Sequence, residues 1–323
     1  RDDFGSESHW AVELGKLVAR AADASARGSA RIELAADGAW RLRSSGKLDR
    51  FDPRPWFPGA PGSAWRRGPH RLDADWKLDL SGAATAPAAT TAAAVATPPT
   101  PKPTRPTQPT PTTTAKRADA SPFDALLALR GEAALDLRPS QLAGVPLRGK
   151  LALRNPAGAT EAVLDLDLRA ADNHIVASGR LRHARDAGCR AAGQQAAAAC
   201  FSDRWQLDID APTLAQLRPI VALHPALANY LPSAGAAQAK ISAVGRWPLL
   251  RSEGTLQASG VKAGAVELGR VDGRWRIGSD ADAPLELRLD GASLAYGENR
   301  LTSLQARVDG SLREQRFELD ATS

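Results

Sequence analysis

Alternation of apolar and charged residues is the feature that most constrains the fold of this chain. It is clearest in Asp73–Leu80, Leu164–Arg169 and Glu286–Asp290, where every second residue is Leu, Ala or Trp and the others are charged. Successive side chains of a strand point to opposite faces, so this period indicates strands with one apolar and one polar face. The same rhythm recurs in Trp10–Leu14, Ala30–Leu34, Ala134–Arg138, Lys150–Arg154, Arg204–Asp210 and Arg316–Ala321.

Short intervals between the alternating segments predict an antiparallel meander of about fourteen strands. The turn signals are Asp37-Gly38, Asn155-Pro156, Asn173, Asp272-Gly273 and Asp309-Gly310. A closed barrel or sandwich of that size needs a well-filled interior, yet the chain has only six Phe, two Tyr and no Met. We therefore expect an all-β fold, an elongated antiparallel sheet curled into a taco-like groove.

Two segments depart from the strand pattern. Residues 82–122 are nearly all Ala, Thr and Pro, a composition that cannot form a core, and are expected to be a disordered linker between sheet segments 1–81 and 123–323. At about 211–231, leucines recur at helical spacing but Pro219 and Pro225 interrupt them, which predicts two short helices.

The net charge of +6 does not indicate nucleic-acid binding. Half of it lies in the linker, and the remainder alternates with acids, with no basic cluster interleaved with aromatics. No uninterrupted apolar run is long enough for a membrane-spanning helix. The chain begins at Arg1 and lacks Met, so we expect an interior piece of a longer protein.

The two cysteines, Cys189 and Cys200, lie in one Ala/Gly-rich loop between predicted strands. We predict a disulfide between them, which would stabilise the fold by about 3 kcal/mol and indicate an oxidising compartment. The alternative is two separate thiols in a loop. No metal-ligand spacing surrounds them, so we predict no metal site.

No motif in the sequence predicts catalysis or a cofactor. Phosphate-binding glycine loops and serine or cysteine nucleophile motifs are absent. The acid pairs Asp165/Asp167 and Asp208/Asp210 resemble a glycosidase dyad in spacing, but they lie on polar strand faces where solvated carboxylates are usual. Trp56, Trp65 and Trp76 are close together and could stack on a sugar or base, although capping the end of the sheet is favoured. The chain is therefore expected not to be an enzyme.

Several stretches resemble the TamB family of AsmA-like proteins, from the translocation and assembly module of Gram-negative bacteria. They are Gly46–Gly59, Ser63–Leu80, Leu129–Arg154, Asp203–Pro219 and Gly245–Gly264, each a degenerate repeat of alternating Leu and Gly. The resemblance implies a curled sheet with an apolar interior that carries phospholipid across the periplasm towards the outer membrane. It also implies an inner-membrane anchor and a contact with a BamA-family barrel, both through regions outside this chain.

The alternation assigns the apolar face that would contact phospholipid acyl chains. An alternative function is a scaffold whose exposed strand edges assist outer-membrane β-barrel or autotransporter assembly. A third is a carbohydrate-active protein that uses the Trp cluster and the acid pairs. The predicted groove-lining residues are Trp76, Leu78, Leu135, Leu137, Leu151, Leu153, Leu164, Leu166, Leu168, Leu207, Ile209, Leu285, Leu287, Leu289, Phe317 and Leu319.

Overall fold

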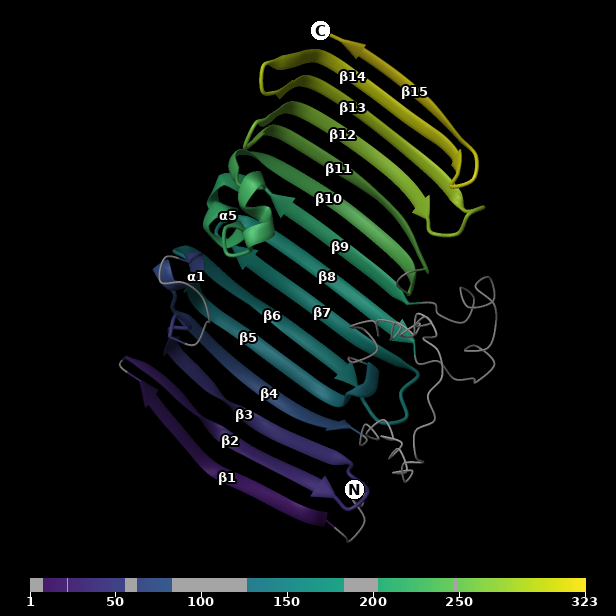
Figure 1. The fold of residues 1–323 in the computed structure, drawn as a ribbon. Helices are drawn as coiled ribbons and strands as arrows, with labels where there is room; N and C mark the ends of the chain where they lie inside the picture. Colours follow the sequence, from purple (N-terminus) through teal and green to yellow (C-terminus); the bar gives the residue numbers. More distant parts are fainter. Residues whose placement is uncertain (1–7, 22, 56–62, 83–126, 183–202, 247–248) are drawn as a thin grey trace, which may run out of the picture.

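The computed structural model describes residues 8–21, 23–55, 63–82, 127–182, 203–246 and 249–323. These residues form a single antiparallel sheet of fifteen strands (Figure 1). The predicted linker 82–122, apart from Gly82, and both cysteines lie outside the described residues, so the linker and the disulfide stay predictions.

Strand order in the sheet is the order along the chain, so each strand pairs only with its sequence neighbours. The first and last strands are not paired with each other, which leaves the sheet open. The strands are β1 (Ser8–Ala21), β2 (Ala24–Ala35), β3 (Trp40–Phe51), β4 (Leu72–Gly82), β5 (Arg130–Leu142), β6 (Val145–Asn155), β7 (Glu161–Ala170), β8 (Asn173–Arg182), β9 (Arg204–Ala211), β10 (Pro232–Arg246), β11 (Leu249–Ala263), β12 (Val266–Gly278), β13 (Pro284–Tyr296), β14 (Asn299–Ser311) and β15 (Gln315–Thr322).

The all-β class and the antiparallel meander are confirmed, with one strand more than expected. The turn predicted at Asp272-Gly273 is wrong, because both residues lie inside β12. Gly273 pairs there with Leu256 on β11 and Leu289 on β13. The turn predicted at Asp309-Gly310 is also wrong, since both residues still pair within β14.

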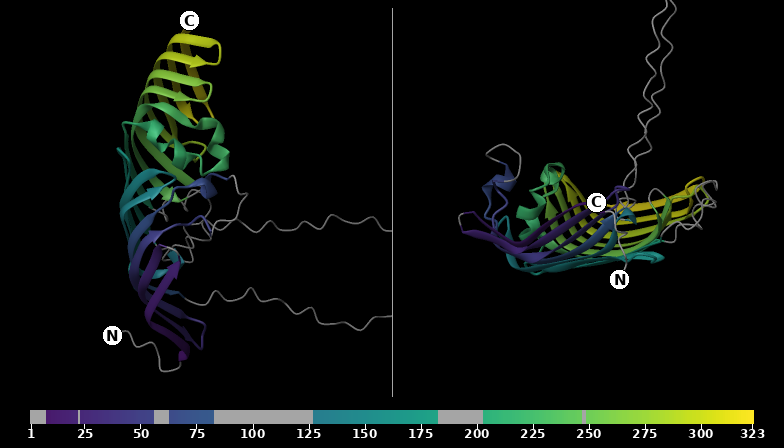
Figure 2. Two further views of the ribbon diagram at one scale, coloured as in Figure 1. Left: turned by 90° about the vertical axis from the view of Figure 1, so that its left-hand side faces the viewer. Right: turned by 90° about the horizontal axis from the view of Figure 1, so that it is seen from below.

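Both helical excursions emerge at the same ends of the strands, which we call the helix rim. The β3–β4 connection carries α1 (Ala64–Arg67), a helix that the sequence did not predict. The β9–β10 connection carries α5 (Leu214–Val221) and the 3-10 helix η1 (Pro225–Tyr230), within the range predicted to be helical. The sheet bends so that both its ends rise on the side occupied by α5, which is therefore the concave side (Figure 2).

One small buried region lies beneath α5. Asn173, Ala211 and Ala239 are at least 93% buried, and all three project from the same side of β8–β10. The Asn173 side chain accepts a hydrogen bond from the Thr213 N–H at 3.1 Å and donates to the Thr213 carbonyl at 3.2 Å. These contacts fix the start of α5 against that side of the sheet.

A second buried region lies at the opposite rim. Leu127, Ala162 and Leu181 form a cluster against which Trp205 packs. Asn155 is fully buried, and its side chain bonds to the carbonyl oxygens of Leu127 and Leu129. The chain entering β5 is thereby held over the ends of β6–β9.

A buried ion pair joins three strands at the same rim. Arg246 on β10 donates two hydrogen bonds, at 2.7 and 3.0 Å, to the carboxylate of Asp203, which is 1% exposed. The same carboxylate accepts the Arg182 N–H from the end of β8. Because each oxygen of this buried charge has a partner, its desolvation is compensated.

Candidate functional site

The strand register aligns apolar residues into continuous rows across the sheet. Directly paired residues of neighbouring antiparallel strands project from the same face. Following these pairs from β1 to β15 gives a middle row without a single polar side chain. The middle row is Leu17, Gly28, Gly46, Trp76, Leu135, Leu151, Leu166, Ala177, Leu207, Ile241, Gly254, Trp275, Leu287, Val308 and Phe317.

A second apolar row, the helix-side row, lies two residues nearer the helix rim. It too contains only apolar residues and glycine across all fifteen strands. The helix-side row is Ala19, Ala26, Leu48, Ala74, Leu137, Gly149, Leu168, Ile175, Ile209, Ala239, Leu256, Gly273, Leu289, Ala306 and Leu319.

The third row, called the far row, lies two residues from the middle row on its other side. Its polar members are Ser44, Ser252 and Gln315. The far row is Leu14, Ala30, Ser44, Leu78, Ala133, Leu153, Leu164, Gly179, Trp205, Ala243, Ser252, Ile277, Leu285, Gly310 and Gln315.

All sixteen predicted groove-lining residues fall in these three rows. Seven belong to the middle row, five to the helix-side row and four to the far row. The structure therefore brings them onto one face, which we call the apolar face. The prediction missed other large apolar members of the rows, among them Ile175, Trp205, Ile241, Leu256, Trp275, Ile277 and Val308.

The apolar face has the dimensions of an extended strip. Rows two residues apart are separated by about 6.8 Å, so the three rows span about 14 Å. Fourteen strand intervals give the strip a length of about 67 Å along the bent sheet. Several of its side chains are open to solvent, with Leu135 39% exposed, Leu151 40%, Phe317 66% and Leu319 68%. A continuous exposed apolar surface of this size is typical of a binding surface rather than a closed core.

Four tryptophans on the apolar face are each paired with a glycine of the next strand. The register pairs are Trp40 with Gly82, Trp76 with Gly46, Trp205 with Gly179 and Trp275 with Gly254. A Cβ placed on any of these glycines would lie 2.5 to 2.7 Å from a ring atom of its tryptophan, so each ring covers bare backbone. We call each pair a Trp–Gly couple; aromatic cover of a glycine is known to support strands.

Two of these couples share a serine as well. The indole N–H of Trp76 donates to the Ser44 hydroxyl at 2.9 Å, and that of Trp275 donates to the Ser252 hydroxyl at 3.1 Å. The segments that supply serine and glycine, Arg43–Leu48 and Arg251–Leu256, repeat the pattern Arg-Ser-x-Gly-x-Leu. This repeat is the sequence signal that could have revealed Trp275 as a member of the apolar face.

The predicted clustering of the early tryptophans is not seen among the described residues. Trp76 lies in the middle row, whereas Trp65 belongs to α1 and donates its indole N–H to the Leu223 carbonyl at 3.1 Å. His70 joins the same excursion to the β5–β6 turn: its Nδ1 accepts the Ala143 N–H at 2.9 Å. Trp65 thus bridges the β3–β4 and β9–β10 connections along the helix rim; Trp56 lies outside the described residues.

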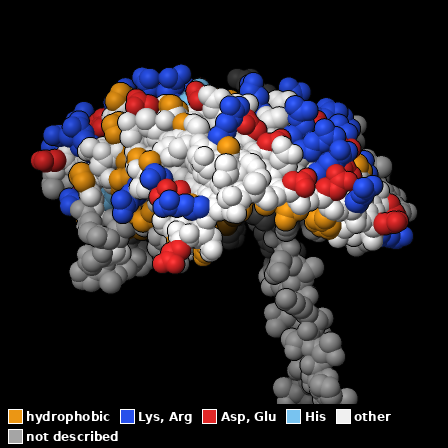
Figure 3. Space-filling view, turned by 90° about the horizontal axis from the view of Figure 1, so that it is seen from above, with side chains coloured by type: hydrophobic (Ala, Val, Ile, Leu, Met, Phe, Trp, Pro, Cys, Tyr) orange, Lys and Arg blue, Asp and Glu red, His pale blue; other side chains and the backbone are white. Residues whose placement is uncertain are grey.

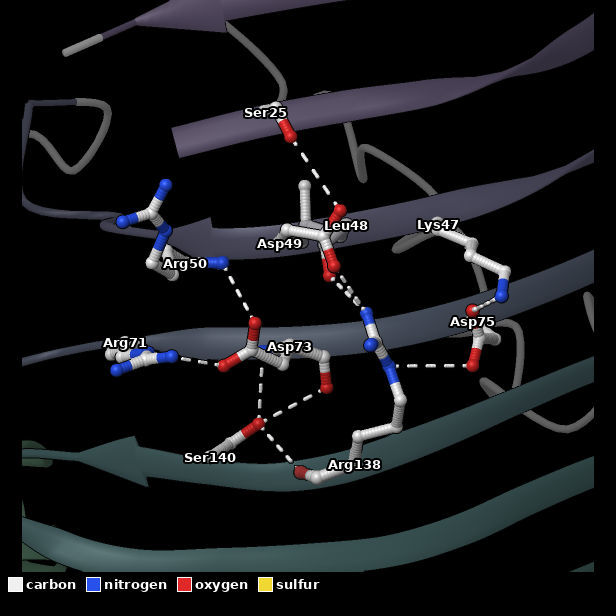
Figure 4. A network of polar contacts seen from close by, with 10 residues as sticks. All are labelled: Ser25, Lys47, Leu48, Asp49, Arg50, Arg71, Asp73, Asp75, Arg138 and Ser140. Carbon is white, nitrogen blue, oxygen red and sulfur yellow. Dashed lines mark hydrogen bonds and ion pairs between the residues drawn. The ribbon is translucent and has the colours of Figure 1, made fainter. Parts of the chain in front are cut away.

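The opposite face is polar, and ion pairs such as Arg41–Asp79 and Arg154–Asp165 join neighbouring strands on it. Charged side chains of both signs are mixed over the surface seen in Figure 3. Near the helix rim Arg138 reaches from β5 across β4 to the Asp49 carboxylate at 2.7 Å and to Asp75 at 3.3 Å (Figure 4). Asp73 and Ser140 complete this network. The hydrogen bond from Arg138 holds the pKa of the Asp49 carboxyl below its ordinary value, and the same bond raises the pKa of Arg138.

The acid pairs occupy this polar face, and three of their four carboxylates are held by neighbours. Asp165 pairs with Arg154 at 2.7 Å, Asp167 with His174 at 2.8 Å, and Asp210 accepts the Gln238 amide at 3.1 Å. In the described part of the chain no group of three His, Cys, Asp or Glu side chains could hold a metal ion.

A hollow of about 690 Å³ lies on the polar face, across β9–β13. Its lining mixes Lys240, Arg274 and Arg288 with acids, and Arg276 pairs there with both Glu253 and Glu286. Charges of both signs interleave, so the hollow has no single chemical preference. The apolar face, uniform over fifteen strands, is the better candidate site.

No family model matches the chain, and neither a curated protein nor a solved structure is significantly similar to it. None of the helices in the described ranges is long and apolar enough to cross a bilayer.

Proposed function

We propose that the apolar face binds the acyl chains of phospholipids and carries them along the sheet as a periplasmic segment of a TamB-like conduit. The observation that supports this is the unbroken middle row, fifteen register positions without a polar side chain. An acyl chain needs apolar contact and no hydrogen bonds, which is what this row offers.

The width of the strip favours a lipid with two chains. Three apolar rows spanning about 14 Å accommodate two extended hydrocarbon chains side by side across the strands. The charged headgroup would remain at a rim or in solvent, because burying an unpaired charge on the apolar face is costly. The conduit carries lipid by contact alone, without a catalytic step or cofactor.

The alternative, strand-edge assistance of outer-membrane β-protein assembly, would use a different part of the sheet. In the described residues every strand from β2 to β14 is paired on both sides, so only β1 and β15 present free edges. The apolar face extends over all fifteen strands. The structure thus offers far more surface for acyl contact than edge for strand addition, and we retain edge assistance as the outcome to be tested against.

Photo-crosslinking at adjacent positions tests the proposal directly. A photo-reactive amino acid at Leu287 or Leu166 projects from the apolar face, while one at Arg288 or Asp167 projects from the polar face of the same strand. We expect phospholipid adducts in cells from the first pair only, identified by mass spectrometry of the purified protein. Equal capture from both faces, or adducts to β-barrel proteins alone, would contradict the proposal.

A charge on the apolar face provides a second test. Leu287 is only partly buried, so Leu287→Arg should lift its guanidinium towards solvent and leave folding intact while lowering lipid capture at Leu166. The matched control is Arg288→Leu on the polar face, which should leave capture unchanged. Loss of folding in Leu287→Arg would show that the face is a closed core.

A further inference from the structure

The four tryptophans of the Trp–Gly couples present a problem for any ligand that lies along the apolar face. Tryptophan is the largest side chain on the face, and side chains of a strand stand roughly perpendicular to the sheet. Two of them, Trp76 and Trp275, occupy the middle row itself. Standing upright, these rings would rise above the leucines on either side and interrupt the row.

The Trp–Gly couples remove this obstacle. At Gly179 a Cβ would lie 2.5, 2.8 and 3.1 Å from three ring atoms of Trp205. At Gly254 it would lie 2.5 Å from Cζ2 and 2.8 Å from Cη2 of Trp275. Each ring therefore occupies the space that a side chain on the neighbouring strand would fill. It is lowered over the backbone of that strand.

The serine partners remove a chemical obstacle as well. An indole N–H left without a partner on an apolar surface would lose its hydrogen bond to water when a hydrocarbon chain covered it. Trp76 and Trp275 donate instead to Ser44 and Ser252, the two serines of the far row. The serines that interrupt this apolar row thus serve the rings of the middle row.

We infer that the glycines of the couples, Gly179 and Gly254 above all, set the height of the apolar face and so decide whether an acyl chain can lie across it. This inference rests on the proposed function and adds positioning residues to it. The glycines need not contact the lipid. They act through the tryptophan rings that they allow to lie low.

Single alanine substitutions test this inference, with lipid capture by a photo-crosslinker at Leu287 as the readout. Gly254→Ala must displace the Trp275 ring next to Leu287, and Gly179→Ala must displace Trp205 without meeting any backbone atom among its nearest neighbours. We expect each to lower capture of phospholipid from phosphatidylcholine vesicles about tenfold, equivalent to losing contact with about two methylene groups.

Gly278→Ala is the matched control. Gly278 ends β12 opposite Arg251 and lies outside the three rows, and its Cβ would meet the Cβ of Ala283 but no aromatic ring. It crowds the strand that carries Trp275 without displacing a tryptophan. We expect its lipid capture to stay within about twofold of the parent protein.

A double variant distinguishes loss of lipid capture caused by the displaced ring from loss caused by a distorted sheet. In Gly254→Ala combined with Trp275→Leu, the ring is gone while the alanine remains, so capture should recover to within about threefold of the parent. Urea unfolding of each variant checks that the sheet is folded. A purely structural role would lower stability further in the double variant and would not restore capture.

The outcomes distinguish this inference from the proposed function. If the parent protein captures lipid and both Gly179→Ala and Gly254→Ala behave like Gly278→Ala, the inference is overturned and the proposed conduit function stands. Failure of the double variant to recover capture overturns it equally. If the parent captures no lipid at Leu287, the proposed function fails and the inference fails with it.

Discussion

The strands β5–β10 and the strands β11–β15 continue the same three rows but are built differently. Over β5–β10 both rims are covered, by α5 at the helix rim and by the Leu127 cluster at the opposite rim. We call these two covers the walls and β5–β10 the walled region. Over β11–β15 the described residues place no helix on either rim. Of the thirteen buried apolar residues in the described part of the chain, only Val271, Ala283 and Val308 belong to the second region.

The comparison indicates that β5–β10 contribute more to the stability of the sheet than β11–β15 do. Stability in a meander comes mainly from neighbouring strands and whatever covers them, because each described strand forms backbone ladder pairs only with its sequence neighbours. In the walled region Leu181, Ala211 and Asp203 are almost completely buried, whereas every residue of β15 is exposed. We expect amide hydrogen exchange to be slowest in β7–β10 and fastest in β15.

The largest expected effect comes from breaking the buried ion pair of the walled region. Asp203→Asn removes the charge facing Arg246 and should lower the free energy of unfolding by about 3–5 kcal/mol. The control is Asp280→Asn, which removes an exposed pair with Arg251 at the same rim and should cost less than about 1 kcal/mol. Urea unfolding measures both, and equal losses would contradict the division into two regions.

A leucine truncation compares the two regions through packing alone. Leu181 is 1% exposed within its cluster, so Leu181→Ala should destabilise by about 2–5 kcal/mol through lost contacts and a cavity. Leu319→Ala on the edge strand, where the side chain is 68% exposed, should change stability by less than about 0.5 kcal/mol. Thermal unfolding of the two variants checks the contrast, and a large loss for Leu319→Ala would show that β15 is covered in solution.

The bridge along the helix rim should have a smaller effect. His70→Ala leaves the Ala143 N–H and the Trp65 carbonyl without their bonds, which should cost about 1–3 kcal/mol. Tyr296→Phe, at the β13–β14 turn of the same rim and 68% exposed, should cost less than about 0.5 kcal/mol. If His70→Ala also speeds hydrogen exchange in α5, then the bridge links the two excursions as the Trp65–Leu223 bond implies.

Acid should give the smallest and most gradual effect. The pKa of the Asp49 carboxyl is lowered in the folded state by its hydrogen bond to Arg138, so this contribution is complete above the ordinary Asp pKa of about 4. It is lost as the pH falls below that value. Asp49→Asn should therefore be less stable than the parent at neutral pH and equal to it once the pH lies below the lowered pKa of the Asp49 carboxyl. A difference that persists in acid would assign the effect to something other than ionisation.

The sequence predicted the faces of the sheet because alternation fixes them locally. Leu164, Leu166 and Leu168 had to share a face whatever the strand paired with. The register was not predictable, since β10 is rich in Ala and Gly and its alternation is too weak to mark Ile241. Nor could the sequence show that Gly254 lies beneath Trp275, because that contact depends on how two strands align.

The two walls could not be predicted from the sequence for a related reason. They arise where residues far apart in the chain meet, such as Trp65 with Leu223 or Leu127 with Leu181. The helical spacing of Leu214 and Leu217 predicted a helix but not the face that it covers. Asn173, which ties that helix down, looked like a turn residue.

Strand order that follows chain order also sets how this molecule could change its length. Inserting one strand would send every later connection to the other rim and move α5 to the side now held by Leu127. Inserting two strands leaves each later connection at the same rim and each later side chain on the same face. The sheet can therefore lengthen or shorten only by whole hairpins, in steps of about 9.6 Å.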